Sequence, residues 1–111
     1  MSTLSIYAVL LLAALLEAGG DALVRQGLQP QGLPSRLTFL AAGAAILFAY
    51  GLLVNSPPWD FGRLLGVYVT LFFLVAQAIN FIGFGLRPTL PILVGGGLIV
   101  GGGAIIAFWR V

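Results

Sequence analysis

The stretch LLLAALLEAGGDALVRQGL, residues 10–28, begins with hydrocarbon side chains alone and then carries three charged residues. Glu17, Asp21 and Arg25 follow one another at four-residue intervals. Residues four apart are neighbours on a helix surface, so we expect the three charges on one face of a single helix. The whole chain has only three acids, and two of them lie here. Their presence inside an apolar segment requires an explanation.

The composition of the chain indicates the solvent in which it folds. Of its 111 residues, 60% are hydrophobic and 7% are charged. A soluble domain carries about 25% charged residues, so these side chains cannot cover a surface that faces water. The composition therefore predicts an integral membrane protein.

The residue types that are missing narrow the chemistry. The chain has no histidine and no cysteine, which removes disulfides, thiolate metal sites and the commonest general base. Its serines lie only near the ends of the apolar runs, so no nucleophile–base pair can be assembled. The five basic residues are scattered and form no patch for nucleic acid. We expect no enzymatic activity, no cofactor, no metal site and no nucleic-acid partner.

Four apolar runs are long enough to cross a bilayer, whose core of about 30 Å requires about 20 apolar residues per helix. Proline-containing turns separate the runs. The first run is expected to be retained as a membrane helix, because no basic residue precedes Leu4 and Glu17 interrupts the apolar core that a signal peptide needs. We predict an all-α membrane protein with short loops, whose single domain, residues 1–111, has spans at about 4–24, 37–54, 64–85 and 90–109.

The positive charges on the two sides of the membrane are balanced. Orientation normally follows an excess of Lys and Arg on the cytoplasmic side. The side with both termini holds the N-terminal amine, Arg63 and Arg110, and the other side holds Arg25, Arg36 and Arg87. Either the protein inserts in both orientations, or another signal fixes its orientation, or a count this small carries no information.

The fourth span is rich in glycine, with the sequence VGGGLIVGGGAI at residues 94–105. Gly97 and Gly101 form a G-x-x-x-G pattern, which permits close contact between membrane helices. Four helices enclose little volume, so we expect a homodimer with these glycines at its interface. The alternative is that they pack the fourth span within its own subunit.

Glu17 is the most informative polar residue. At 1.5 Å per residue it lies ~20 Å into the first span, inside the hydrocarbon but nearer the far end. A charge at that depth costs at least ~2.5 kcal/mol on insertion scales, so the carboxylate needs a proton or a cation. Proton or cation coupling is therefore the first hypothesis. In the alternative, Asp21 and Arg25 form an internal salt bridge and Glu17 is protonated. This alternative explains Asp21 better than Glu17, because Glu17 is two turns from Arg25.

Three further residues are candidates for a substrate pathway. Gln77 and Asn80 are the other deep polar groups, and they either hydrogen-bond between helices or line the pathway. Tyr68 lies about one turn inside the third span, where its ring either contacts a cation or belongs to the interfacial belt. Asp21 joins them as a pathway candidate.

Several short patterns together resemble the small multidrug resistance (SMR) transporter superfamily. The pattern E-x-x-G-x-x-L-x-[KR] is carried by Glu17, Gly20, Leu23 and Arg25. The second half is most similar to the YnfA-like branch of that superfamily. The pattern G-R-x-x-x-x-Y, which opens the third helix in that branch, is carried by Gly62, Arg63 and Tyr68. Further on, where that branch tends to have Gly, Lys, Thr and Gly, this chain has Gly85, Arg87, Thr89 and Gly95.

The resemblance implies an exporter of the bacterial inner membrane built from two copies, often packed antiparallel. The two copies of Glu17 would alternate between protons and a small cationic substrate. Tyr68 would contact the substrate, and the fourth helix would form the dimer interface. Asp21, Leu65, Gln77 and Asn80 depart from the superfamily pattern.

Two other function classes remain open at this point. One is an accessory membrane subunit in which Glu17 pairs with an intramembrane arginine of a partner. The other is a fluoride-type channel, which residues 19–25 faintly resemble. The third span lacks the Thr/Ser/Phe cluster of such channels, and an acid in the pathway would repel an anion.

Overall fold

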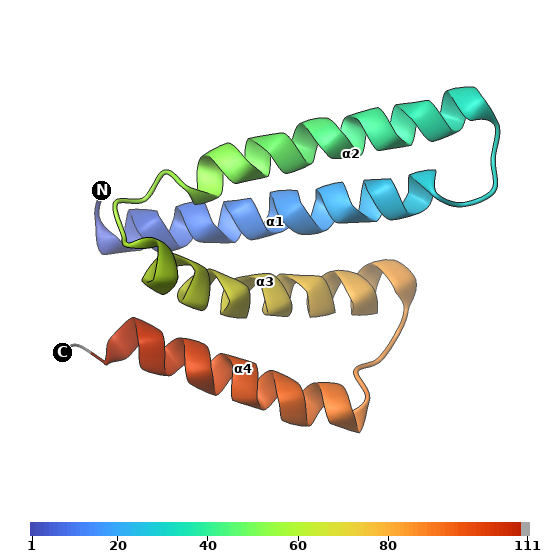
Figure 1. Ribbon diagram of the computed structural model, residues 1–111. Coiled ribbons are helices and arrows are strands. Elements are labelled where there is room, and N and C mark those ends of the chain that lie inside the picture. Colours follow the sequence, from blue (N-terminus) through green and yellow to red (C-terminus); the bar gives the residue numbers. More distant parts are fainter. Residues whose placement is uncertain (110–111) are drawn as a thin grey trace. The chain divides into compact units, whose positions relative to one another are not determined.

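The computed structural model describes residues 1–109 and contains four helices (Figure 1). All four are long and apolar enough to cross a membrane, which confirms the predicted all-α fold with four spans. Their bounds are α1 Thr3–Gly27, α2 Leu33–Val54, α3 Phe61–Phe84 and α4 Leu90–Phe108. Arg110, which entered the count of positive charges, lies outside the described residues.

The first two helices extend beyond the predicted spans because their end residues are compatible with a helix. α1 continues past Val24 to Gly27, and Arg25 in its last turn carries a positive charge where the helix dipole favours one. α2 begins at Leu33 rather than residue 37, since Pro34 occupies its first turn. Proline is tolerated there because the N–H that it lacks would have no helical partner.

Local capping sets the ends of α3. Asp60 precedes the helix, and its carboxylate oxygen Oδ2 accepts a hydrogen bond of 3.0 Å from the backbone N–H of Arg63. This N-cap starts the helix at Phe61, three residues before the predicted boundary. Gly85 ends the helix in a left-handed conformation with φ of 67°, which glycine adopts without a steric penalty.

The outside of the chain is apolar, as a helix in lipid requires. No charged side chain among the described residues is buried, and the only buried side chain with a polar group is that of Tyr68. Large hydrophobic side chains are instead widely exposed, among them Leu4, Phe48, Ile82 and Leu98. Hydrocarbon rather than water must solvate these surfaces.

The chain divides into two compact units, each a helical hairpin. In the first unit, Ser2–Ser56, α1 and α2 run antiparallel side by side (Figure 1). Gly20 and Gly43 allow this packing: a Cβ on Gly43 would lie 3.0 Å from the backbone oxygen of Gly20. Near the loop, Nε of Arg36 donates a 3.2 Å hydrogen bond to the carbonyl of Gly27. The two helices thus approach each other backbone to backbone.

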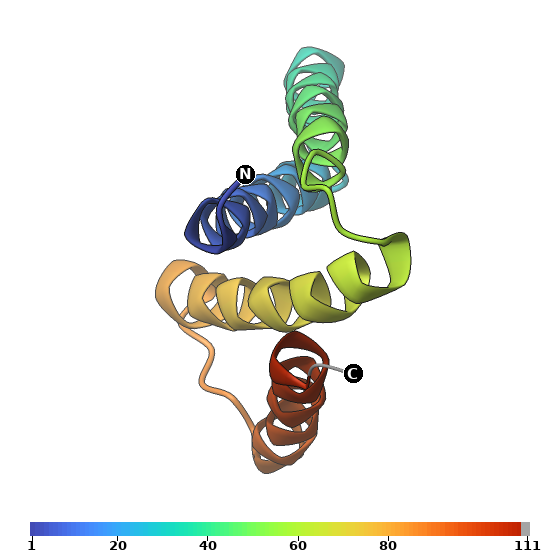
Figure 2. The ribbon, with the colours of Figure 1, turned by 90° about the vertical axis from the view of Figure 1, so that its left-hand side faces the viewer.

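The second unit, from Pro57 onward, contains α3 and α4. The hydroxyl of Thr70 donates a 3.2 Å hydrogen bond to the carbonyl of Ile99, and an Nη atom of Arg63 donates one of 3.4 Å to the carbonyl of Ala107. Both views show the two helices moving apart toward the segment that joins them (Figures 1 and 2). The grouping of the two hairpins into one domain stays a prediction.

Candidate functional site

Glu17 lies close to the middle of α1. The helix runs from Thr3 to Gly27, so its central residue is Leu15, two positions before Glu17. The extension of α1 beyond Val24 therefore places the carboxyl deeper than the predicted span did, ~15 Å from the C-terminal end of the helix. The side chain is half-buried and engages in a polar or electrostatic interaction within the chain.

The three charges of α1 do not share one environment. Glu17 is half-buried, whereas Asp21 and Arg25 are exposed. A step of four residues turns the helix by about 40° more than a full turn. The row of charges therefore drifts away from the face that packs on α2. Among residues 1–109, no ion pair joins Asp21 to Arg25.

Small residues surround Glu17 on its own helix. The adjacent positions on a helix surface are three and four residues away, here Ala13, Ala14, Gly20 and Asp21. The first three are buried and offer only methyl groups or hydrogen. No large side chain of α1 at these positions covers the carboxyl, although Leu47 of α2 fills the space beside Gly20.

Tyr68, the candidate for substrate contact, is buried in α3 with 3% of its surface exposed. Its ring stacks on that of Phe72, with a centroid distance of 6.1 Å and an angle of 26° between the planes. The Tyr68–Phe72 pair presents two aromatic rings one turn apart. Such rings attract cations that come within about 6 Å of a ring face.

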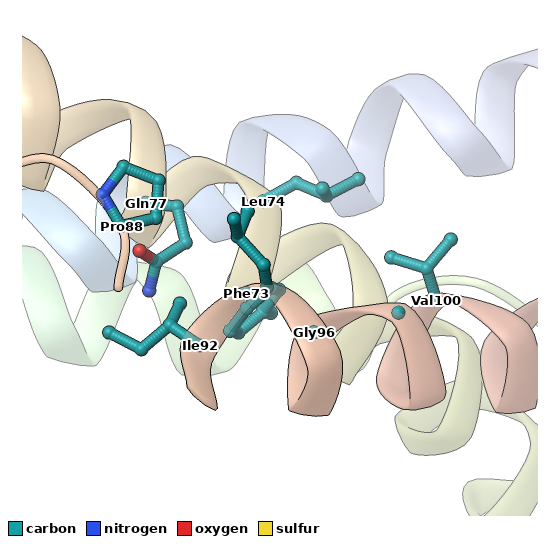
Figure 3. Close-up of a pocket in the computed structure, with 9 residues that line it drawn as sticks. Phe73, Leu74, Gln77, Pro88, Ile92, Gly96 and Val100 are labelled. Atoms are coloured by element: carbon teal, nitrogen blue, oxygen red, sulfur yellow. The ribbon is translucent and has the colours of Figure 1, made fainter. Parts of the chain in front are cut away.

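Gln77 lines a cavity of about 370 Å³ between α3 and α4 (Figure 3). Its amide is the only polar side-chain group in the lining. The other lining residues are apolar or glycine: Phe73, Leu74, Pro88, Ile92, Leu93, Gly96, Gly97 and Val100. Asn80 lies one turn further along α3 and does not line the cavity; its backbone carbonyl accepts a 3.1 Å hydrogen bond from the N–H of Leu86.

The glycines of α4 divide into two sets. Gly97 and Gly101, the predicted dimer contacts, are exposed, and a Cβ on either would meet nothing within 4 Å. Gly96 and Gly103 are buried, and a Cβ there would overlap Phe73 or Thr70 of α3. The second set was missed by the sequence reasoning, although its seven-residue spacing is the signal of one helix face.

The cavity and the predicted coupling residue belong to different hairpins. Gln77 and the cavity lie between α3 and α4, whereas Glu17 lies on α1. The cavity contains no acid and no base, so it offers nothing for exchanging a proton. We therefore assign the candidate chemistry to Glu17 and treat the cavity as a separate feature.

Curated membrane proteins of two bacteria are similar to this chain over most of its length. The UPF0060 membrane protein of Herpetosiphon aurantiacus is 35% identical over 101 residues, which cover 89% of each chain. The UPF0060 membrane protein of Nocardia farcinica is 37% identical over 98 residues, which cover 87% of this chain and 86% of that protein. The chain belongs to the UPF0060 family of membrane proteins.

Membership of the UPF0060 family agrees with the four membrane-spanning helices, and the chain is a multi-pass integral membrane protein. No family model and no solved structure matches it. The family name assigns no substrate, no proton coupling and no oligomeric state.

Proposed function

We propose that this UPF0060 protein is a proton-coupled exporter of a small cationic molecule in a bacterial inner membrane. The observation that carries the proposal is the position of Glu17, half-buried at the middle of a membrane-spanning helix with small neighbours at the adjacent positions. An ionisable group at that depth is costly and marks an ion or proton pathway. The resemblance to the YnfA-like branch of the SMR superfamily supports the same role.

Competition between a proton and a cation at one carboxyl gives the coupling. Glu17 must release its proton before it can bind a cation, so one site never holds both. In the protonated form and in the cation-loaded form the charge of Glu17 is neutralised, and the site can switch its access from one side of the membrane to the other. The deprotonated carboxylate without a bound cation cannot, because a net negative charge is costly in hydrocarbon. A proton gradient then drives the cation out of the cell.

The proposed transporter is a homodimer, in parallel or antiparallel packing. The four spans of one chain enclose little volume, and two copies can form a pathway between them. The exposed face of α4 that contains Gly97 and Gly101 supports this arrangement, since small residues permit close helix contact in lipid. Tyr68 and Asp21 are proposed to contact the substrate.

The test is charge movement in proteoliposomes on a solid-supported membrane, challenged with a panel of organic cations. The wild type is compared with Glu17→Gln, which keeps the shape of the side chain and removes its titration. We expect a pH-dependent current from the wild type and none from the variant. Fluoride is included, and a fluoride current that survives in Glu17→Gln would favour a channel.

A matched control distinguishes the loss of the acid at position 17 from the loss of an acid elsewhere in the chain. Asp60→Asn also turns an acid into its amide, but it lies outside the spans, and asparagine caps a helix as well as aspartate does. This variant should keep the full current. Proton-coupled uptake that persists in Glu17→Gln would overturn the proposal, as would an equal loss in both variants.

A further inference from the structure

The cavity between α3 and α4 is unexplained by a function centred on Glu17. It lies within a single hairpin, and its lining is hydrocarbon apart from the amide of Gln77 (Figure 3). A volume of about 370 Å³ is within the range of ligand sites in proteins, which begins near 300 Å³. The cavity therefore has the size and the chemistry of a binding site for an apolar group.

The glycine contacts explain why the hairpin opens where it does. Going along α3, Gly66 meets Ile106, Thr70 meets Gly103 and Phe73 meets Gly96. Beyond Phe73 the cavity begins, and Pro88 of the connecting segment lines its far end. The packing thus closes one half of the hairpin and leaves the half near the connecting segment open.

The surroundings of the hairpin determine what fills this space. α3 and α4 are both membrane-spanning, so acyl chains are the molecules that reach an apolar groove between them. An unfilled groove would cost its lining the dispersion contacts that hydrocarbon supplies. We propose that the α3–α4 cavity binds one acyl chain of an anionic phospholipid, with Arg87 holding the phosphate and Gln77 the ester group.

Arg87 supplies the charge for the headgroup. It immediately precedes Pro88, which lines the cavity, and its side chain is exposed at the end of the span. Among residues 1–109 its guanidinium has no hydrogen-bond or ion-pair partner. Guanidinium groups bind phosphate oxygens in a bidentate manner, and neither the cavity nor residues 85–89 contain an acid that would repel the phosphate.

Gln77 supplies the second polar contact. Its amide points toward Pro88 and Ile92 in the open half of the hairpin (Figure 3), and it has no hydrogen bond within the described chain. An amide without a partner is costly in hydrocarbon. Gln77 lies seven residues before Phe84, the last residue of α3, so it is ~10 Å below the end of the helix. An acyl ester carbonyl, which lies deeper than the phosphate, can accept the Nε2–H of Gln77.

The experiment is native mass spectrometry of the purified full chain with added phosphatidylglycerol or phosphatidylcholine of identical acyl chains. The spectra resolve the oligomeric state and the number of bound lipids together, and the comparison uses the monomer peak because the cavity lies within one chain. We expect one retained lipid per chain and about fivefold preference for phosphatidylglycerol, equivalent to ~1 kcal/mol for one arginine at an anionic surface.

Three variants locate the site. Arg87→Gln should lose the preference and bind both lipids equally. Gly97→Leu places a side chain at the cavity lining and should lose both lipids. Gly102→Leu is the control, because it also adds leucine to an open face of α4 but does not line the cavity.

Two results would overturn the assignment: equal binding of both lipids to the wild type, or wild-type binding by Gly97→Leu. Circular dichroism of each variant checks that the helices are intact. Glu17→Gln should bind lipid as the wild type does, so a failure of the exporter proposal leaves this test unaffected.

Discussion

The two hairpins of this protein use glycine in different ways. In α1–α2, Leu47 fills the space beside Gly20 and Leu40 fills the space beside Gly27, but at Gly43 two backbones meet. A Cβ on Gly43 would be 3.2 Å from the backbone nitrogen of Val24 and 3.0 Å from the oxygen of Gly20. In α3–α4, the space beside each buried glycine holds a side chain of the opposite helix. Phe73 fills it at Gly96, and Thr70 fills it at Gly103.

This difference relates packing to function. A backbone-to-backbone contact has no rotamer to adjust, so the contact at Gly43 fixes the distance between α1, which carries Glu17, and α2. A side chain set against a glycine can change its rotamer, and α3–α4 packs this way in one half while leaving a cavity in the other. The hairpin with the proposed proton site is therefore the closed one, and the hairpin with the proposed lipid site is the open one.

The largest effect on stability is expected at the backbone contact. In Gly43→Ala the new Cβ would lie 2.7 Å from Cγ2 of Val24 and 3.0 Å from the Gly20 oxygen, so the helices must separate. We expect a loss of about 1–3 kcal/mol, the usual cost of overpacking, in equilibrium unfolding of the purified protein by SDS. Gly51→Ala is the control on the same helix, because its Cβ meets nothing within 4 Å.

A smaller loss is expected at the corresponding place in the second hairpin. In Gly103→Ala the new Cβ overlaps the side chain of Thr70. Rotation of Thr70 can move its Oγ1 but not its Cβ, which would lie 2.7 Å from the new atom, so α4 must shift. Because this hairpin is already open at one end, we expect the shift to cost near the lower end of the same range, about 1 kcal/mol. Gly102→Ala, which faces open space, corrects for the helix preference of alanine. If Gly103→Ala proved more costly than Gly43→Ala, the contrast between the hairpins would be wrong.

The smallest effect is expected from the hydrogen bond that joins α3 to α4. Thr70→Val keeps the shape of the side chain and removes the hydroxyl that donates to the Ile99 carbonyl. Hydrogen bonds between membrane helices contribute about 0.6 kcal/mol on average, and we expect a loss of that size in the same unfolding assay. A loss above that of Gly103→Ala would mean that the bond, rather than glycine packing, holds the hairpin together.

The sequence predicted the four spans well and their ends less well. Apolar runs of about 20 residues give the number of spans because the bilayer sets a minimum length. The ends were misplaced where a polar or proline residue supports the helix, as Pro34 does in α2 and Asp60 does before α3. Both residues were left outside the predicted spans, although proline is favoured in the first turn of a helix and aspartate at its N-cap.

The candidate site was predictable in part. Glu17 could be found from its cost in hydrocarbon, which needs only the sequence. The cavity beside Gln77 could not, since its lining combines residues from α3, α4 and the segment between them. The roles of Glu17, Asp21, Tyr68, Gln77 and Asn80 in transport, and of Gly97 and Gly101 in dimer formation, stay predictions.

By itself, the sequence determined that this is a membrane protein with four spans and an acid, Glu17, within the apolar part of the first. These properties depend only on composition and on distance along the chain, because the thickness of the bilayer sets the length of apolar sequence that each span needs. Only the tertiary structure decided that Gly96 and Gly103, rather than Gly97 and Gly101, pack directly against side chains of α3. That choice depends on how each helix is rotated about its own axis, and in a helix that is apolar on all sides no hydrophobic pattern fixes the rotation.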